Sequence, residues 1–172
     1  MQGSYIPRHV ANALILEGPR FGHRTTHMRV QKLLYILQGF SLALYDKPAL
    51  SESFAAWPFG PALESVFADL SKWGDERITS MIPEPSLLHR RIEQGFLPVC
   101  TDGDFWNLLH RVLQSYRDWS DVKLGALANG ELSAWRAVVP KDQEGDRAPC
   151  GPVKLLDNDR IRHHFRQAIQ AA

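Results

Sequence analysis

Apolar positions along the 172-residue chain recur mostly at helical spacing, and they predict helices separated by proline- and glycine-rich breaks. A first helix is predicted over residues 6–17, with Pro7 at its start and Gly18-Pro19 after its end. Thr25 or Thr26 can cap a longer helix that extends to about Tyr45. Because apolar residues surround more than half of its circumference, we expect this second helix to be central and packed on several sides.

Residues 54–61, with the sequence Phe-Ala-Ala-Trp-Pro-Phe-Gly-Pro, cannot continue as a helix. They predict an ordered loop with a short extended piece before Pro58. A third helix is predicted over residues 62–73, because Pro61 suits a helix start and Gly74 a helix end. Residues 75–101 contain three prolines and predict a loop-rich segment with a short structured piece at residues 87–92.

The second half of the chain continues the helical pattern. We expect a single compact domain over residues 1–172 that is mainly α, with about six or seven helices and little or no β structure. After residue 101 the sequence predicts a helix capped by Asp104 over residues 105–119 and a helix from Ser120 or Asp121 to residue 127. One or two turns are predicted over 131–138, followed by a solvated loop over 141–152. An extended piece over 153–156 then leads to a last helix capped by Asp157.

Composition and charge indicate a globular protein without a strong preference for polyanions. The chain is 44% hydrophobic and 23% charged, and its formal net charge is +1. The longest apolar-rich stretch, residues 33–44, is far shorter than the roughly 20 residues of a membrane span. No leader-like apolar run is visible, so we expect a cytoplasmic location and no membrane partner.

Candidate catalytic chemistry is sparse. Cys100 and Cys150 are 50 residues apart in the sequence, which is typical of two reduced thiols, although a thiol hydrolase or transferase stays an alternative. No nucleophile elbow or phosphate-binding glycine loop is present. His23 and His27 have the spacing of zinc ligands but no third ligand nearby. We therefore expect no enzyme activity, no cofactor and no metal.

Basic residues gather between Arg20 and Lys32, near the start of the second helix. This cluster makes a DNA-binding autoregulator an alternative. The second helix is too apolar to lie exposed in a DNA groove, however, so a solvated basic rim, or one facing an acidic partner, is favoured. We therefore regard nucleic acid as a less favoured partner.

Two sequence blocks resemble the Panacea domain of SocA-type antitoxins, which also occurs in phage-associated proteins. The first contains Lys-Leu-Leu-Tyr at residues 32–35 and Gln-Gly-Phe at 38–40, and the second contains Ala-Trp-Pro-Phe-Gly-Pro at 56–61. The family pattern has Lys-Leu-Leu-Tyr, Gln-Gly-Trp and Ala-Trp-x-x-Gly-Pro-Val in this order. Phe40 and Ala62 depart from it, and Ala128-Asn129 stands near the place of its Thr-His pair.

The resemblance implies a mainly helical antitoxin that neutralises a toxin encoded beside it by direct binding. Delivery of the toxin to a protease is an alternative mode. Two roles stay open for the aromatic loop, which either plugs the core or presents a rigid anchor to the partner. Lys32, Tyr35 and Gln38 are equally compatible with structural roles. The predicted partner-binding residues are Lys32, Tyr35, Trp57, Phe59, Gly60 and Pro61.

Overall fold

Helices account for most of the described chain. The structure is a computed structural model, and it describes residues 3–85, 92–93, 96–98, 101–139 and 154–171. Within these residues the prediction of a mainly α fold with six or seven helices is confirmed. The six α-helices are α1 (Pro7–Glu17), α2 (His27–Tyr45), α3 (Glu64–Leu70), α4 (Gly103–Ser115), α5 (Asp121–Asn129) and α6 (Asn158–Gln170), and two 3₁₀ turns are η1 (Gly18–Phe21) and η2 (Ser71–Trp73).

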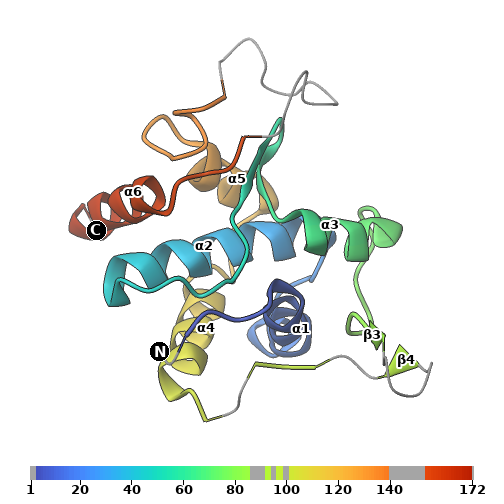
Figure 1. The fold of residues 1–172 in the computed structure, drawn as a ribbon. Coiled ribbons are helices and arrows are strands. Elements are labelled where there is room, and N and C mark those ends of the chain that lie inside the picture. Colours follow the sequence, from blue (N-terminus) through green and yellow to red (C-terminus); the bar gives the residue numbers. More distant parts are fainter. Residues whose placement is uncertain (1–2, 86–91, 94–95, 99–100, 140–153, 172) are drawn as a thin grey trace.

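Helix α2 lies at the centre of the fold, as its all-round apolar pattern predicts. Its N-cap Thr26 accepts a hydrogen bond from the backbone amide of Arg29, which confirms the predicted start. Helices α1, α4, α5 and α6 all pack against α2 (Figure 1). Most of its residues are therefore buried on every side.

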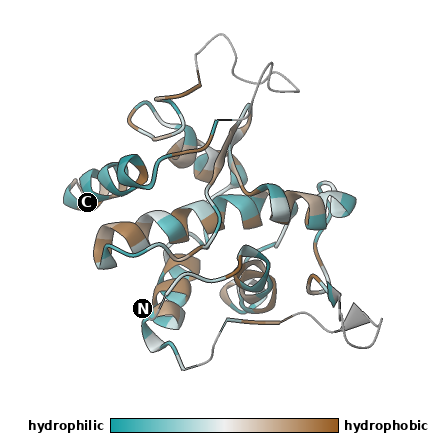
Figure 2. Ribbon diagram, in the orientation of Figure 1, coloured by the Kyte–Doolittle hydropathy of each residue, from teal (hydrophilic) through white to brown (hydrophobic). Residues whose placement is uncertain are grey.

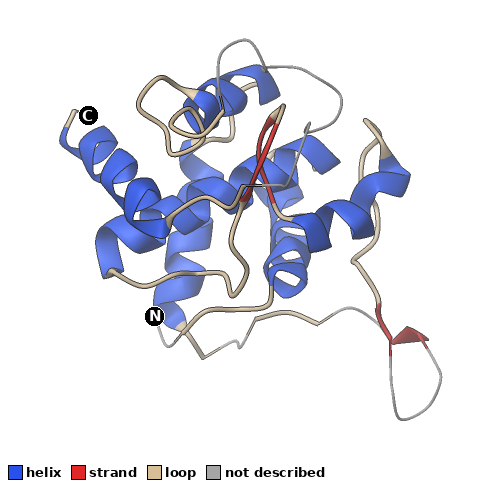
Figure 3. Cartoon of the chain, turned by 45° about the horizontal axis from the view of Figure 1, so that its top comes forward, coloured by secondary structure: helices blue, strands red, loops and turns tan. Residues whose placement is uncertain are grey.

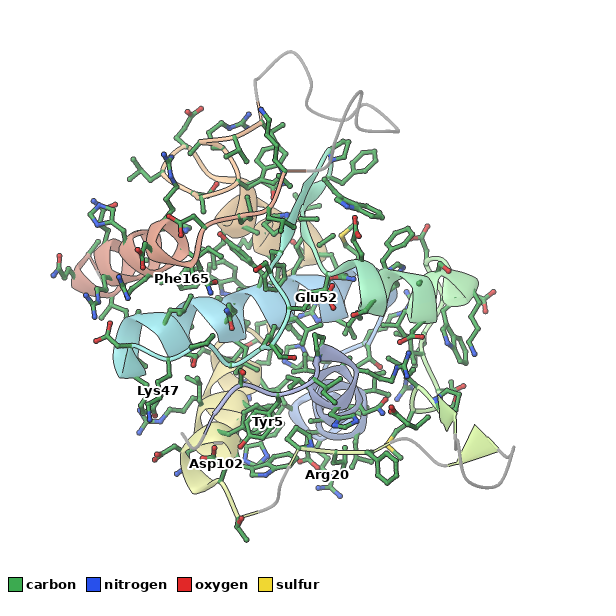
Figure 4. The ribbon with its side chains drawn as sticks, in the orientation of Figure 1. Tyr5, Arg20, Lys47, Glu52, Asp102 and Phe165 are labelled. Carbon is green, nitrogen blue, oxygen red and sulfur yellow. The ribbon has the colours of Figure 1, made fainter. Side chains whose placement is uncertain are left out.

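Helix α6 crosses α2 at a very close approach. It is largely hydrophilic (Figure 2), and it buries Ile161 and Phe165. Phe165 (Figure 4) places its ring against Gly39 of α2, where a Cβ atom would overlap it. The glycine of the Gln-Gly-Phe block therefore makes room for a second helix.

Side-chain caps fix the starts of the later helices. Asp157 caps α6 as predicted, and Ser120, one of the two predicted starts of α5, is its cap. The predicted cap of α4 was Asp104, but Asp102 accepts the bond from the amide of Phe105. Asp102 also accepts a hydrogen bond of 2.6 Å from the hydroxyl of Tyr5 (Figure 4). This second contact explains why Asp102, and not Asp104, is the cap of α4.

The aromatic loop forms a small β-hairpin, which agrees with the expectation of little β structure. Strand β1 (Ala55–Trp57) pairs antiparallel with β2 (Gly60–Ala62). On its other edge β1 exchanges hydrogen bonds with residues 154–156, which are extended as predicted. Because Pro61 and Ala62 belong to β2, helix α3 begins at Glu64 and not at residue 62, and only the 3₁₀ turn η2 continues it to Trp73.

A second pair of short strands, β3 (Glu84–Pro85) and β4 (Ile92–Glu93), lies away from the hairpin (Figure 3). The predicted piece at residues 87–92 lies mostly outside the described residues, as do the predicted loop at 141–152 and Val153. Residues 131–139 form consecutive turns. None of the described helices is both long enough and apolar enough to cross a membrane.

Candidate functional site

The tip of the hairpin is a tight turn that requires glycine at one position. Trp57 pairs with Gly60, and Pro58 and Phe59 form the turn between them. Gly60 has a φ of 111°, a conformation that residues with a Cβ rarely adopt. A Cβ atom at this position would also overlap the Nζ of Lys32 and the Oδ1 of Asn129. The turn therefore lies directly on these two side chains.

Three buried or half-buried side chains from different elements hold the turn by its main-chain oxygens. Lys32 on α2 donates a hydrogen bond of 2.8 Å from Nζ to the carbonyl oxygen of Phe59, and Asn129 on α5 donates to the same oxygen at 3.4 Å. The indole Nε1 of Trp135 donates to the carbonyl oxygen of Trp57 at 2.6 Å. The tip of the hairpin is thus fixed to α2, to the end of α5 and to the turns that follow α5.

The base of the hairpin is fixed to the same helix. Gln31 accepts a hydrogen bond of 3.0 Å from the backbone amide of Leu63 and donates one of 3.1 Å to its carbonyl oxygen. This amide side chain therefore replaces a strand partner for the residue that leads into α3. Consecutive residues of α2, Gln31 and Lys32, hold both ends of β2.

Lys32 is a buried cation, and none of the described residues supplies a compensating charge. Its side chain is only 2% exposed, and burial lowers the pKa of its ammonium group to about 8. In the described part of the chain, the carbonyl oxygen of Phe59 is its one hydrogen-bond acceptor, and no carboxylate pairs with it. An ammonium group has three donors, so Lys32 retains unused hydrogen-bonding capacity.

A cavity of about 280 Å³ opens beside this lysine, and we call it the hairpin cavity. One wall is aromatic, because the ring of Phe67 lies 4.5 Å from that of Trp57 and 4.8 Å from that of His27. Burial lowers the pKa of His27, so that its ring is neutral at pH 7. The residues that line the cavity are His27, Met28, Gln31, Lys32, Trp57, Phe59, Gly60, Pro61, Ala62, Phe67, Ser71, Gly74 and Asp75.

Further polar atoms around the hairpin are buried and have no hydrogen-bond partner among the described residues. They are the indole Nε1 of Trp57, the Nε2 of His27 and the Oδ1 of Asn129. Unsatisfied buried polar atoms are uncommon in folded proteins, and they often mark a place where a ligand or partner completes the bonding. Of these residues Trp57 and His27 line the hairpin cavity, and the indole N–H of Trp57 is a donor that an acceptor in the cavity would satisfy.

The structure brings five of the six predicted partner-binding residues together. Lys32, Trp57, Phe59, Gly60 and Pro61 all line the hairpin cavity. The two rings of the aromatic loop differ in exposure. Trp57 is half-buried against Phe67, whereas Phe59 at the tip is 55% exposed.

Tyr35 lies elsewhere, in the core. It is fully buried, and its ring packs edge-on against Phe54 and Phe165. Gln38 holds the segment after α2, because its Oε1 accepts hydrogen bonds from the amides of Ala49 and Leu50. For both residues this geometry favours the structural role.

Gln31, Asn129 and Trp135 are residues of the site that sequence reasoning did not select. A signal existed for Asn129, because it stands near the place of the Thr-His pair in the family pattern. Its contact with the turn shows that the altered position belongs to the same site as Lys32.

The expectation of a solvated basic rim between Arg20 and Lys32 was wrong. His23, Arg29 and Lys32 are all buried, and of this cluster only Arg20 and Arg24 are well exposed. Arg29 forms an ion pair of 2.6 Å with Asp121 and donates a hydrogen bond of 2.7 Å to the carbonyl oxygen of Trp119. The cluster therefore ties the start of α2 to the connection between α4 and α5.

The described residues show no group of three or more metal-ligating side chains. Cys100 and Cys150, on which the thiol-enzyme alternative depends, lie outside the described residues.

Comparison with known proteins identifies the family of the chain. A family model described as Antitoxin SocA-like, Panacea domain, matches residues 30–136. That range covers more than half of the chain and contains every side chain that holds the hairpin, from Gln31 to Trp135. No curated protein and no solved structure matches the chain significantly. The chain therefore belongs to the SocA-like antitoxin family that carries the Panacea domain.

Proposed function

We propose that the protein is a non-enzymatic antitoxin of the cytoplasm that neutralises a protein toxin by direct binding, with the hairpin tip as its contact surface. The observation that carries this proposal is an exposed aromatic side chain, Phe59, on a turn whose main-chain oxygens accept hydrogen bonds from side chains of α2, α5 and the following turns. Family membership supports the antitoxin role.

Rigidity at the tip favours binding because little conformational freedom is lost when the partner docks. Aromatic side chains supply much of the binding energy at protein interfaces, especially beside a cavity that excludes water. Phe59 is an aromatic side chain on a turn held by hydrogen bonds, and it lies beside the aromatic wall of the hairpin cavity. No comparable observation supports DNA binding, because the basic side chains of α2 are engaged inside the fold.

Co-expression with the gene encoded beside this one tests the proposal. We expect the neighbouring product to arrest growth alone and the wild-type protein to restore growth. Phe59→Ala should abolish the rescue, whereas Tyr45→Ala should keep it. Tyr45 is a matched control because it is also a surface aromatic, 36% exposed, at the far end of α2.

Purification separates the modes of neutralisation. Direct binding predicts that the toxin accumulates and is isolated in a stable complex with this protein. Loss of the toxin during co-expression, with recovery in a strain that lacks the responsible protease, would instead indicate delivery to a protease. A harmless neighbour, or a rescue unaffected by Phe59→Ala, would contradict the proposal.

A further inference from the structure

Within the described residues, the ammonium group of Lys32 has fewer hydrogen-bond acceptors than donors, and no negative charge lies beside it. Its ammonium group donates one hydrogen bond, to the carbonyl oxygen of Phe59, and no anion within the described residues balances its charge. A buried cation without a partner is unfavourable, whereas a carboxylate beside it supplies both charge and acceptors. Asn129 also donates to the Phe59 oxygen, so Lys32 can share its protons without leaving that oxygen unbonded.

The walls of the hairpin cavity restrict what can accompany such a carboxylate. Met28, Phe67 and Pro61 are apolar, and the indole of Trp57 adds a donor that has no partner in the described part of the chain. A volume of about 280 Å³ lies just below the range of roughly 300–1,000 Å³ typical of small-molecule sites. It suits one or two side chains of a bound protein segment.

We infer that the hairpin cavity receives an acidic side chain of the partner together with a neighbouring apolar side chain, and that the carboxylate binds Lys32 and the apolar group packs on Trp57 and Phe67. This inference rests on the proposed function for the identity of the partner. The bonding chemistry of the cavity can be tested without it.

Blocked dipeptides provide a test that needs no toxin. N-acetyl-leucyl-glutamate N-methylamide and its glutamine counterpart differ only in the carboxylate. At millimolar concentrations the glutamate peptide should shift the indole NMR signal of Trp57, assigned with Trp57→Phe. It should also raise the pKa of Lys32, followed through its Cε signals, by at least one pH unit. The glutamine peptide should cause neither change, and Lys32→Met should abolish both responses.

The toxin provides the second test. Carboxylate binding requires the ammonium form, so the affinity of the wild-type protein should fall by up to tenfold per pH unit above about pH 8. The other titratable groups that line the cavity are His27 and Asp75, and burial lowers the pKa of His27, so that its ring stays neutral in this pH range. Lys32→Met should bind about 10–100-fold more weakly and without this pH dependence. One Asp→Asn or Glu→Gln substitution in the toxin should reproduce the loss and add little to Lys32→Met.

The outcomes separate the inference from the proposed function. Equal responses to both peptides, or to neither, would overturn the carboxylate site. A loss of neutralisation with Phe59→Ala but not with Lys32→Met would also overturn it while leaving the antitoxin role intact. A carboxylate-dependent peptide response in a protein that neutralises no toxin would support the site and contradict the function. A loss caused only by removing the toxin's C-terminal carboxylate would overturn the assignment to an acidic side chain.

Discussion

The ammonium group of Lys32 lies 2.8 Å from the main-chain oxygen of Phe59, and this hydrogen bond joins the central helix to the tip of the hairpin. It connects the Lys-Leu-Leu-Tyr block to the Trp-Pro-Phe-Gly-Pro turn, which are 27 positions apart at this contact. The two most specific parts of the family pattern therefore form one site.

Lys32→Met tests whether the lysine serves stability or binding. Its ammonium loses hydration, which corresponds to about 3 kcal/mol for a pKa lowered from 10.5 to about 8, and it regains about 1 kcal/mol from the Phe59 bond. We expect the variant to unfold in urea at the same or a higher concentration than the wild type. Between pH 8 and 10.5 the wild type should gain stability with rising pH, because the folded lysine has released its proton while the unfolded lysine still holds one, and the variant should lack this gain. A loss of 2 kcal/mol or more in the variant would indicate a structural lysine.

Gly60→Ala should disrupt the turn. Its φ of 111° is strained for alanine, and the added Cβ would overlap Lys32 and Asn129. We expect a decrease of about 2 kcal/mol or more in the free energy of unfolding. Gly22→Ala is the matched control, because Gly22 has a φ of 82° but open space around it, and it should lose only about 1 kcal/mol. Equal losses would show that the close approach at Gly60 is unimportant.

Gly39→Ala tests the contact between α2 and α6. Alanine favours a helix by about 1 kcal/mol, but here its Cβ would overlap the buried ring of Phe165. We expect a net destabilisation of about 2 kcal/mol in thermal or urea unfolding. Gly125→Ala in α5 meets no atom within 4 Å and should stabilise the protein instead. Stabilisation by both substitutions would contradict the described packing.

Because His23 is buried, we expect the protein to lose stability in mild acid. Its Nδ1 accepts a hydrogen bond of 2.8 Å from Arg29, so its Nε2 carries the proton and donates to the carbonyl oxygen of Leu113 at 2.7 Å. The ring is therefore neutral, and burial lowers its pKa. Because the unfolded chain binds the proton more readily, stability should be complete above about pH 6.5 and fall as the pH decreases below it.

Urea unfolding at pH 7.5, 6.5 and 5.5 measures this effect. The slope from one histidine is at most about 1.4 kcal/mol per pH unit. His27 and His164 have pKa values lowered by burial as well, so they add to the same trend. His23→Gln should remove the contribution of His23 to the pH dependence of the unfolding free energy. An unchanged slope in that variant would contradict the neutral, buried state of His23.

The helices were predictable because local signals define them. Thr26, Ser120 and Asp157 stand directly before apolar residues at helical spacing, and each caps a helix. Asp102, and not Asp104, caps α4, and it also accepts a hydrogen bond from Tyr5. Tyr5 is distant in sequence, so no local pattern shows this contact.

The hairpin was not predictable in the same way. Its strands have three residues each, and β1 is completed by residues 154–156 from near the other end of the chain. The burial of Lys32 and Arg29 depends on acceptors that come from residues 59 and 119. Basic residues are usually exposed to solvent. Here residues distant in sequence supply hydrogen-bond acceptors, so Lys32 and Arg29 are buried instead.

Amide hydrogen exchange of the protein, alone and bound to its toxin, tests the central claim most directly. If the hairpin tip contacts the toxin, the largest added protection should fall on residues 57–63, and residues 40–46 around Tyr45 should exchange as before. Unchanged exchange at the hairpin, with protection on another face, would contradict the account.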